Sequence, residues 1–331
     1  MASRPRLAVL GSLNMDITVD VERLPRPGET VLGGAARFAP GGKGANQAVA
    51  AARLGGPGTV SMSGCVGDDA FGAQLVAALQ ADGIATTTVR RLASAPSGIA
   101  MITVDAAGEN VITVAPGANA ETGQPELDAV LAAQPDVLVI SAEIPRPVVR
   151  AALTMDAAGI TILNLAPAEE GAAIIAAGVD WLVVNESEAG AVLGHPVAGL
   201  REAASAAADL AKLGPRTAVV TAGEAGAAMA GTAGTATMPG FLVHAVDAVG
   251  AGDTFVGALA VAIAEGVAPD EALRAACAAG ATAATRPGAQ SGMPHPSDIE
   301  SVTGYRWPLA RLPLVSGRQS PVFGHWPLAG S

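Results

Sequence analysis

Cysteine, aromatic residues and charge are all scarce in this chain of 331 residues. It has two cysteines, five phenylalanines, three tryptophans and one tyrosine, and only 15% of its residues are charged. Cys65 and Cys277 are too few and too far apart for a disulfide scaffold or a cysteine metal site, and they suggest a reducing compartment. The formal net charge of −11 argues against nucleic acid or an anionic membrane as the main partner.

Long apolar runs are also absent, although half of the residues are hydrophobic. No uncharged segment is long enough to span a bilayer, and the excess of apolar residues is mainly alanine, valine and leucine. The basic residues 1–6 precede only a short strand-like run and then Asp16, which is not the pattern of a signal peptide. The sequence therefore predicts a soluble cytoplasmic protein.

Strand-like apolar runs alternate with alanine-rich helical stretches along most of the chain. This alternation predicts an α/β fold in which a parallel sheet has helices on both faces. The predicted strands are 7–10, 137–140, 161–165, 181–184, 217–221 and 241–246, and the predicted helices are 126–133, 148–158, 200–213, 254–263 and 270–285.

Two stretches break the alternation, at about 16–38 and 96–115. The first contains Pro-Arg-Pro-Gly at 25–28 between short β-type runs, and the second turns at 105–108 between two strand-like runs. Both are typical of a small antiparallel sheet separate from the main one.

The segment 247–258, Asp-Ala-Val-Gly-Ala-Gly-Asp-Thr-Phe-Val-Gly-Ala, lies where a strand-like run meets a helical one. Small residues at such a turn leave backbone N–H groups free to bind an anion such as phosphate at the positive end of the helix dipole. Asp253 in the same turn is suited to take a proton from a hydroxyl that attacks the bound phosphorus. An aspartate here can also be only a helix cap, so this motif alone leaves both interpretations open.

Upstream, Gly41-Gly-Lys-Gly-Ala-Asn-Gln47 opens a helical stretch, with Lys43 and Asn46 close together. It is not a Walker P-loop, because Gly44 and not Ser or Thr follows the lysine. Asn14 and Asp16 follow the first predicted strand, at the edge where open α/β sheets bind ligands. They suit pairs of sugar hydroxyls, although either alone is equally compatible with an Asx-turn.

Together these motifs resemble the ribokinase-like carbohydrate kinase family. The glycine-rich segment at 41–47, Gly-Ala-Gly-Asp at 250–253 and Asn-Glu-Ser-Glu at 185–188 occur in the family's order and spacing, and the resemblance covers about residues 6–300. It implies a three-layer α/β/α sandwich with a mainly parallel sheet. It also implies one kinase domain over 1–302, with lid strands from 16–38 and 96–115 that cover the sugar and form a homodimer contact.

The resemblance further implies phosphorylation of the O5 hydroxyl of D-ribose by ATP, giving D-ribose 5-phosphate. Asp253 would be the general base and Gly250, Ala251 and Gly252 the anion hole. The implied sugar ligands are Asn14, Asp16, Gly42, Lys43, Asn46 and Glu143, together with Asp253. The implied nucleotide contacts are Asn185, Thr221, Gly223, Gly226, Gly252 and Cys277; the cysteine is also compatible with a buried structural role.

The resemblance also implies that the protein binds two cations, Mg²⁺ and a monovalent cation. Mg²⁺ would be held through water by Asn185 and Glu188, whose carboxylate is also compatible with a helix start. A monovalent cation, usually K⁺, would lie near Asp247, Val249, Ala283, Arg286, Gly288 and Gly292. Ala248 and Gly292 depart from residues common in the family, so the cation site is less well defined than the base.

Substrate identity stays open at this level, because one fold serves many acceptors. 2-Deoxyribose, another sugar or a nucleoside are alternatives to ribose. A protein of a different class, a sugar-binding regulator that has lost catalysis, is opposed by the intact Asp253 and Asn-x-x-Glu motif. Residues 303–331 have no periodicity and are predicted to be a poorly ordered extension without a catalytic role.

Overall fold

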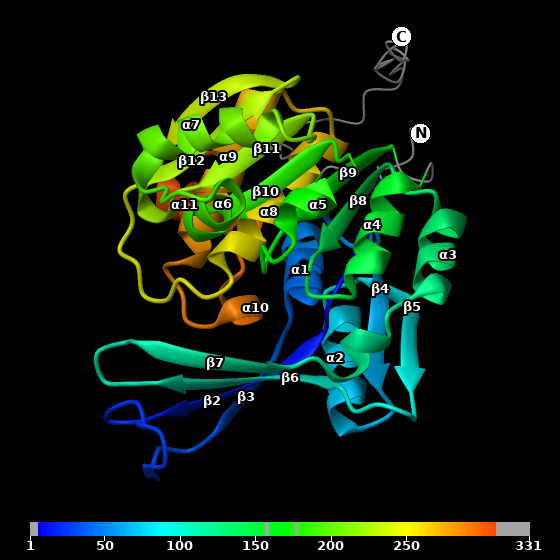
Figure 1. Ribbon diagram of the computed structural model, residues 1–331, viewed down its shortest axis with the longest axis vertical. Coiled ribbons are helices and arrows are strands. Elements are labelled where there is room, and N and C mark those ends of the chain that lie inside the picture. The colour runs from blue at the N-terminus through cyan, green and yellow to red at the C-terminus, as the bar shows by residue number, and fades with distance from the viewer. Residues whose placement is uncertain (1–5, 156–158, 176–177, 309–331) are drawn as a thin grey trace.

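The structure of the protein, a computed structural model, describes residues 6–155, 159–175 and 178–308. Within these residues the chain forms one large sheet and one small sheet (Figure 1). The large sheet has the order β13-β12-β11-β10-β9-β8-β1-β4-β5 and is parallel from β11 to β5. Its strands are β1 (Leu7–Leu10), β4 (Val60–Gly67), β5 (Ala85–Leu92), β8 (Val137–Ser141), β9 (Ile160–Asn164), β10 (Trp181–Asn185), β11 (Thr217–Thr221), β12 (Gly226–Gly231) and β13 (Gly234–Pro239).

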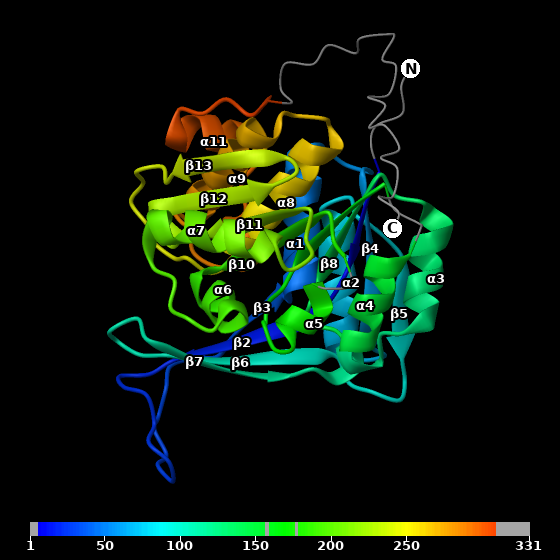
Figure 2. The ribbon, with the colours of Figure 1, turned by 45° about the horizontal axis from the view of Figure 1, so that its top comes forward.

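Helices cover both faces of the large sheet because its central strands are apolar on both sides. In β1, Leu7 and Val9 join one hydrophobic core, whereas Ala8 and Leu10 join a second. The helices are α1 (Lys43–Gly55), α2 (Ala70–Ala81), α3 (Gln124–Ala133), α4 (Arg146–Thr154), α5 (Gly171–Ile175), α6 (Glu186–Leu193), α7 (Gly199–Ala211), α8 (Ala251–Ala264), α9 (Pro269–Ala283), α10 (Ala289–Gly292) and α11 (Pro296–Thr303), with short 3₁₀ turns η1 (Gly117–Glu121) and η2 (Gly223–Ala225). The first core contains α1, α2, α8 and α9, and the second contains α3 to α7 (Figure 2).

The small sheet consists of β2 (Asn14–Asp20), β3 (Arg37–Gly41), β6 (Gly98–Val104) and β7 (Asn110–Ala115), in the order β3-β2-β6-β7. Strand β2 follows β1 after only three residues, so the small sheet grows directly from the centre of the large one. It lies across one edge of the core, with α10 beside it (Figure 1). Its pairing is mixed: β2 and β6 are parallel, and the two outer pairs are antiparallel.

The predicted fold class is confirmed: a mainly parallel sheet lies between two layers of helices, and a second small sheet lies apart. The small sheet was expected to be antiparallel, and its central pair is not. Both sheets contain strand pairings that the sequence pattern did not indicate. One example is the antiparallel pairing of β12 with β11 and β13 at one edge of the large sheet. No helix of the described residues is long and apolar enough to cross a membrane.

Two local predictions were wrong. Residues 241–246 are not a strand, because no neighbouring strand pairs with them and Leu242 is fully exposed. The start of the predicted C-terminal extension is folded: Tyr305 and Trp307 are buried in the first core, and the Tyr305 hydroxyl donates a hydrogen bond to Glu271 at 2.6 Å. The remainder of that predicted extension, 309–331, and the end of the predicted helix 148–158 lie outside the described residues.

Candidate active site

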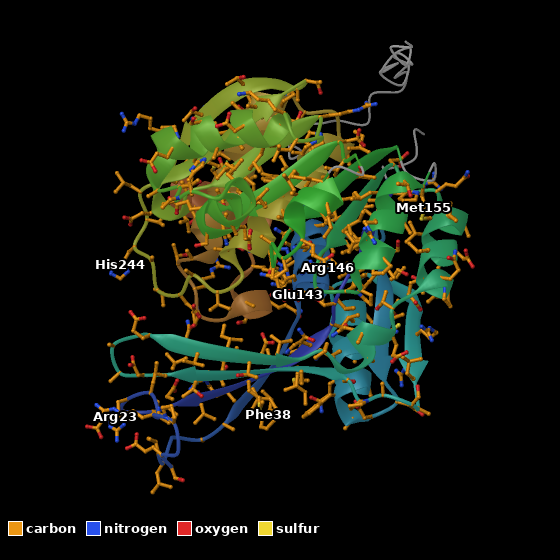
Figure 3. The ribbon with its side chains drawn as sticks, viewed as in Figure 1. Arg23, Phe38, Glu143, Arg146, Met155 and His244 are labelled. Atoms are coloured by element: carbon orange, nitrogen blue, oxygen red, sulfur yellow. The ribbon has the colours of Figure 1, made fainter. Side chains whose placement is uncertain are left out.

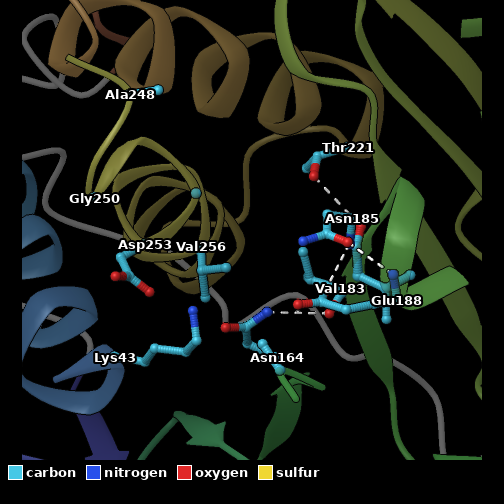
Figure 4. Close-up of a pocket in the computed structure, with 13 residues that line it drawn as sticks. Lys43, Asn164, Val183, Asn185, Glu188, Thr221, Ala248, Gly250, Asp253 and Val256 are labelled. Carbon is cyan, nitrogen blue, oxygen red and sulfur yellow. Dashed lines mark hydrogen bonds between the residues drawn. The ribbon is translucent and has the colours of Figure 1, made fainter. Parts of the chain in front are cut away.

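A pocket of about 210 Å³ lies where the carboxyl ends of β9, β10 and β11 face the start of α8 (Figure 4). It follows from the topology, because parallel strands bring their carboxyl ends to one edge of the sheet and leave helix N-termini facing it. The lining residues are Lys43, Asn164, Ala166, Val183, Val184, Asn185, Glu188, Thr221, Ala248, Gly250, Gly252, Asp253 and Val256.

The start of α8 presents backbone donors to this pocket. Gly250, the residue before the helix, has a left-handed φ of 77°, and a Cβ there would lie 2.8 Å from the Cα of Ala289. At Gly252 a Cβ would meet no atom within 4 Å, so this turn is open to a ligand. The N–H groups of Gly252 and Asp253 have no partner among the described residues, whereas the N–H of Ala251 already donates to the carbonyl of Ala248 at 3.2 Å. Of the three predicted anion-hole residues, Ala251 is therefore the one whose N–H is engaged.

Asp253 is buried at the first turn of α8 and is held from α1. Asn46 Nδ2 donates to one of its carboxylate oxygens at 2.9 Å, and Gln47 Nε2 donates to the other at 3.0 Å. Each carboxylate oxygen thus has its own amide donor, and both donors come from neighbouring residues of α1. The two motifs found more than two hundred residues apart in the sequence meet at this carboxylate.

Lys43, the first residue of α1, points its amine toward Asp253 and Asn164 (Figure 4). The negative charge of Asp253 is the main cause that raises the pKa of Lys43, and burial opposes it. Glu143 and Glu188 raise this pKa further. Lys43 therefore brings a positive charge into a pocket whose lining also includes the carboxylates of Glu188 and Asp253.

Asp16 lies on β2 of the small sheet, beside the same carboxylates. Burial raises its pKa to about 7, and the negative charges of Glu143 and Asp253 add to that rise. A carboxyl that titrates near neutrality in a cleft is typical of a binding or catalytic site.

The predicted sugar ligands Glu143 and Asn14 are held by polar groups from the end of β1, from α1 and from η1. Ser12 Oγ donates to Glu143 at 2.6 Å, and the backbone N–H of Lys43 donates to the same oxygen at 3.2 Å. Asn119 Nδ2 donates to Asn14 Oδ1 at 2.8 Å, which leaves the Asn14 amino group free to donate elsewhere. Figure 3 shows Glu143 between the core and the small sheet. Asn14 and Asp16 lie on β2 of the small sheet, Lys43 and Asn46 lie on α1, and Gly42 and Glu143 lie just before α1 and just after β8.

Asn185 and Glu188 form a capping box at the start of α6. The Asn185 side chain accepts from the N–H of Glu188, and the Glu188 carboxylate accepts from the N–H of Asn185, both at 2.8 Å. Burial raises the pKa of Glu188. The cap uses one oxygen of each side chain, and Glu188 keeps its second oxygen for the pocket, which fits contact with a hydrated Mg²⁺ through water.

The predicted monovalent-cation residues lie together beside the start of α8. Asp247 accepts from the N–H of Val249 at 3.0 Å and from that of Gly288 at 2.8 Å, which ties the two loops together. A Cβ at Gly292 would lie 3.2 Å from the Arg286 carbonyl and 3.3 Å from the Ala283 carbonyl, so both oxygens converge there. Backbone carbonyls beside a carboxylate are hard oxygen donors, which fit K⁺.

The predicted nucleotide residues are only partly brought together. Thr221 and Asn185 line the pocket at the ends of β11 and β10, and Gly223 and Gly226 bound the η2 turn that follows. Cys277 does not line this pocket: it is buried in the first core on α9, and burial raises its pKa to about 12.

Sequence reasoning missed five polar residues of the site. Three of them, Gln47, Asn164 and Gln290, belong to the hydrogen bonds around Asp253, and Ser12 and Asn119 hold the sugar side. Gln47 stands inside the glycine-rich motif, and Asn164 is a polar residue at the end of a buried strand, so both had a local signal. Gln290 and Asn119 had none, because only tertiary contacts reveal their partners.

Comparisons with known proteins agree with this geometry. The sequence profile described as pfkB family carbohydrate kinase matches residues 4–296. A ribokinase of Haemophilus influenzae is 37% identical over 295 residues, which cover 88% of this chain and 96% of that protein. A deoxyribokinase of Salmonella typhi is 35% identical, over 87% of this chain and 95% of that protein. The structure of Arabidopsis thaliana ribokinase complexed with ribose and ATP superposes with a TM-score of 0.78 and 30% identity, over 90% of this chain and 98% of the other.

Proposed function

The chain belongs to the pfkB family of carbohydrate kinases, and we propose that it transfers the γ-phosphoryl group of ATP to the O5 hydroxyl of D-ribose. The observation that carries this proposal is the buried carboxylate of Asp253, held by two amides and set in the open helix turn of α8. The similarity to a ribokinase solved with ribose and ATP favours this acceptor and this donor. The product is D-ribose 5-phosphate.

In this proposal Asp253 is the general base. It takes the proton of the O5 hydroxyl as the O5–P bond forms and the bond from the γ-phosphorus to the bridging oxygen breaks, so that ADP leaves. General base catalysis is typically worth about 10²–10⁴-fold. The N–H groups of Gly252 and Asp253, with the turn at Gly250, would stabilise charge on the transferred group, and each such donor is typically worth about 10²–10³-fold.

The sugar would lie between the small sheet and α1. Asn14 would donate from its free amino group, and Asp16 and Glu143 would accept from sugar hydroxyls. Lys43 and Asn46 would contact the sugar near the reacting hydroxyl, with the backbone of Gly42 approaching closely. Lys43 also offers the positive charge needed beside a γ-phosphate.

The nucleotide would extend from the anion hole along the ends of β10 and β11. Asn185, Thr221, Gly223 and Gly226 would contact it, and Gly252 would contact its phosphates. Cys277 would lie behind the adenine-binding region as part of its wall. Mg²⁺ would be held by Asn185 and Glu188 through water, and K⁺ by Asp247 and the carbonyls of Val249, Ala283, Arg286, Gly288 and Gly292. When bound, both cations supply positive charge that offsets the charge of the phosphates.

A second acceptor, 2-deoxyribose, is favoured by the 35% identity to a deoxyribokinase. The two sugars differ by a single hydroxyl. A site that hydrogen-bonds this hydroxyl would lose a partner with 2-deoxyribose, whereas a site that does not contact it would accept both sugars.

The direct test is ADP release from Mg·ATP with D-ribose, 2-deoxyribose, fructose or a nucleoside as acceptor, with K⁺ or an inert cation present. The expected result is the highest kcat/KM with D-ribose, with the phosphate on O5 by NMR of the product. A higher kcat/KM with 2-deoxyribose would show that 2-deoxyribose is the preferred acceptor. Sugar binding without turnover of any acceptor would support the alternative that the protein is a non-catalytic sugar-binding regulator.

We also propose that the chain forms a homodimer through the small sheet, which would then act as a lid over the sugar. Five large apolar side chains of this sheet are about half exposed: Phe38, Met101, Val111, Ile112 and Val114. Apolar side chains gathered on an exposed sheet are typical of an interaction surface.

A further inference from the structure

The amide of Gln47 is fully buried between two acceptors that come from opposite sides of the site. Its Nε2 donates to Asp253 Oδ1 at 3.0 Å and to Asn164 Oδ1 at 2.9 Å. Asn164 in turn donates its own amino group to the Val183 carbonyl at 3.3 Å. Because a carbonyl and a carboxylate only accept, these partners determine the orientation of both amides.

We propose that Gln47 is a positioning residue for the general base: it holds the Asp253 carboxylate against β9 and stabilises its ionised form. This inference rests on the proposed function, because it assigns Gln47 a role in that reaction. Through Gln47 the carboxylate is tied to α1 and, by way of Asn164, to the large sheet, so its direction does not depend on the sugar.

Asn46 also donates to the Asp253 carboxylate, but it differs from Gln47 in two respects. Asn46 donates to the other oxygen, Oδ2, and its own carbonyl accepts from Gln290 Nε2 at 3.1 Å. It is also an expected sugar ligand, so replacing it would change binding and positioning together. Gln47 has no exposed surface and acts only through its neighbours, which separates the two effects.

The charges that face Asp253 come from three other elements. Lys43 on α1 attracts the carboxylate, and Asp16 on β2 and Glu188 on α6 are each coupled to it by repulsion. Glu143 acts on Asp16 and Lys43. Replacing Gln47 by an uncharged residue leaves all of these charges in place, so a shift in the pH profile reports the lost donor.

Gln47 Oε1 is buried and has no hydrogen-bond partner in the described structure. Substitution by methionine, which has a similar shape, therefore removes the two Nε2 hydrogen bonds and no others. Gln47→Glu places a second carboxyl beside Asp253, and two adjacent carboxyls tend to share one proton. Both substitutions thus act on Asp253 Oδ1: the first removes its donor, and the second also adds a competing carboxyl.

The test is the pH profile of kcat for wild type, Q47M and Q47E, with Q80M and Q80E as controls on the exposed face of α2. As pH falls, activity is lost when the base becomes protonated, so weaker stabilisation of the carboxylate moves this acidic limb to higher pH. We expect a shift of about one pH unit in Q47M and a larger one in Q47E, with KM values within about twofold of wild type. The Gln80 variants should follow the wild-type profile.

An unmoved acidic limb in both Gln47 variants would overturn the inference, and so would a raised sugar KM at unchanged kcat, which would indicate direct sugar contact. A wild type that turns over no acceptor would instead contradict the proposed function. In that case the Asp253 carboxyl ¹³C resonance, identified by its loss in D253N, tests positioning without turnover. Its titration midpoint should be higher in Q47M than in wild type, and equal midpoints would contradict the role of Gln47.

Discussion

At the scale of single residues, the chemistry of the site depends on the surroundings of its carboxylates. Asp253 receives two amide donors, whereas Asp16, on the small sheet, is partly buried and lies near the negative charges of Glu143 and Asp253. Different surroundings therefore give the two side chains different chemistry: Asp253 is prepared to accept a proton, and Asp16 changes charge near neutral pH.

Asp253→Asn should remove the base and leave the binding groups in place. We expect kcat to fall by about 10²-fold or more, because the amide accepts no proton, with the ATP dissociation constant changed little. Steady-state kinetics and calorimetric titration measure the two effects. Asp270→Asn at the exposed start of α9 is the control, and near-normal turnover of D253N would refute the assignment of the base.

Sugar affinity should depend on pH through Asp16. With a pKa of about 7 the carboxyl is mostly protonated at pH 6 and mostly ionised at pH 8. The ionised form is the stronger acceptor for sugar hydroxyls, so we expect sugar to bind about tenfold more weakly at pH 6 than at pH 8, with a proton released on binding. Calorimetry in buffers of different ionisation enthalpy measures both, and an affinity independent of pH would contradict this role.

The same carboxyl should affect stability in the opposite direction. Its pKa is higher in the folded state than its ordinary value of 3.8, so its contribution to stability is greatest below about pH 4 and is lost as pH rises to about 7. Asp16→Asn cannot ionise and should therefore gain melting temperature relative to wild type as pH rises from 5 to 8. A difference that is constant across this range would show that burial does not raise this pKa.

At the scale of elements, close packing of α1 against α8 brings the two motifs together. Gly257 allows it: a Cβ there would lie 2.7 Å from the Cβ of Ala50 and 2.8 Å from the Gln47 carbonyl. Helices approach this closely only where one of them lacks a side chain. The contact is made one turn from Asp253 and at Gln47 itself, so packing and catalysis depend on the same few residues.

Gly257→Ala should force α1 and α8 apart. Overpacking typically costs about 1–3 kcal/mol, and the shift would lengthen the hydrogen bonds to Asp253, so both the unfolding free energy and kcat should fall. Gly55→Ala at the end of α1 is the matched control, because its nearest contact is the Thr59 side-chain oxygen at 3.3 Å and alanine favours the helix. Urea unfolding measures the free energy of unfolding of both variants. Equal values would show that close packing at Gly257 does not contribute to stability.

At the scale of the whole molecule, strand register divides the apolar side chains of the small sheet between two faces. Phe38, Ile17 and Met101 lie in one row and Val111 shares their face, whereas Ile112 and Val114 share the face of Asp16. Figure 3 shows Phe38 on the opposite side of the sheet from Glu143. The proposed dimer contact therefore has two candidate faces.

We expect the face of Met101 and Val111 to form the dimer, because it points away from the sugar. Their double substitution by aspartate should yield a monomer by light scattering, since two charges would have to be buried in the contact. Leu213→Asp, on an exposed residue at the end of α7, is the control and should not change the mass. If the wild-type protein is a monomer, the proposed dimer is wrong. If only Ile112→Asp and Val114→Asp cause dissociation, the dimer contact lies on the other face of the sheet.

The fold class and the position of each main motif along the chain could be predicted from the sequence. Buried strands, alanine-rich helices and glycine-rich turns have local causes in backbone freedom and side-chain pattern, so they can be predicted without partners. The sequence also predicted Asp253, Lys43, Asn46 and Glu143 as site residues, and the structure brings them to one place.

The contacts between distant side chains, and their burial, required the folded structure. Asn46 and Asp253 are 207 residues apart in sequence, and Asn46 Nδ2 lies 2.9 Å from Asp253 Oδ2; Gln290, from a third segment, donates to Asn46 Oδ1. The tertiary structure also buries Cys277 in the first core and outside the pocket lining, engages the Ala251 N–H, leaves residues 241–246 without a strand partner and buries Trp307. These outcomes depend on long-range packing, burial and charge, which local sequence does not encode because each requires a partner that is distant in the chain.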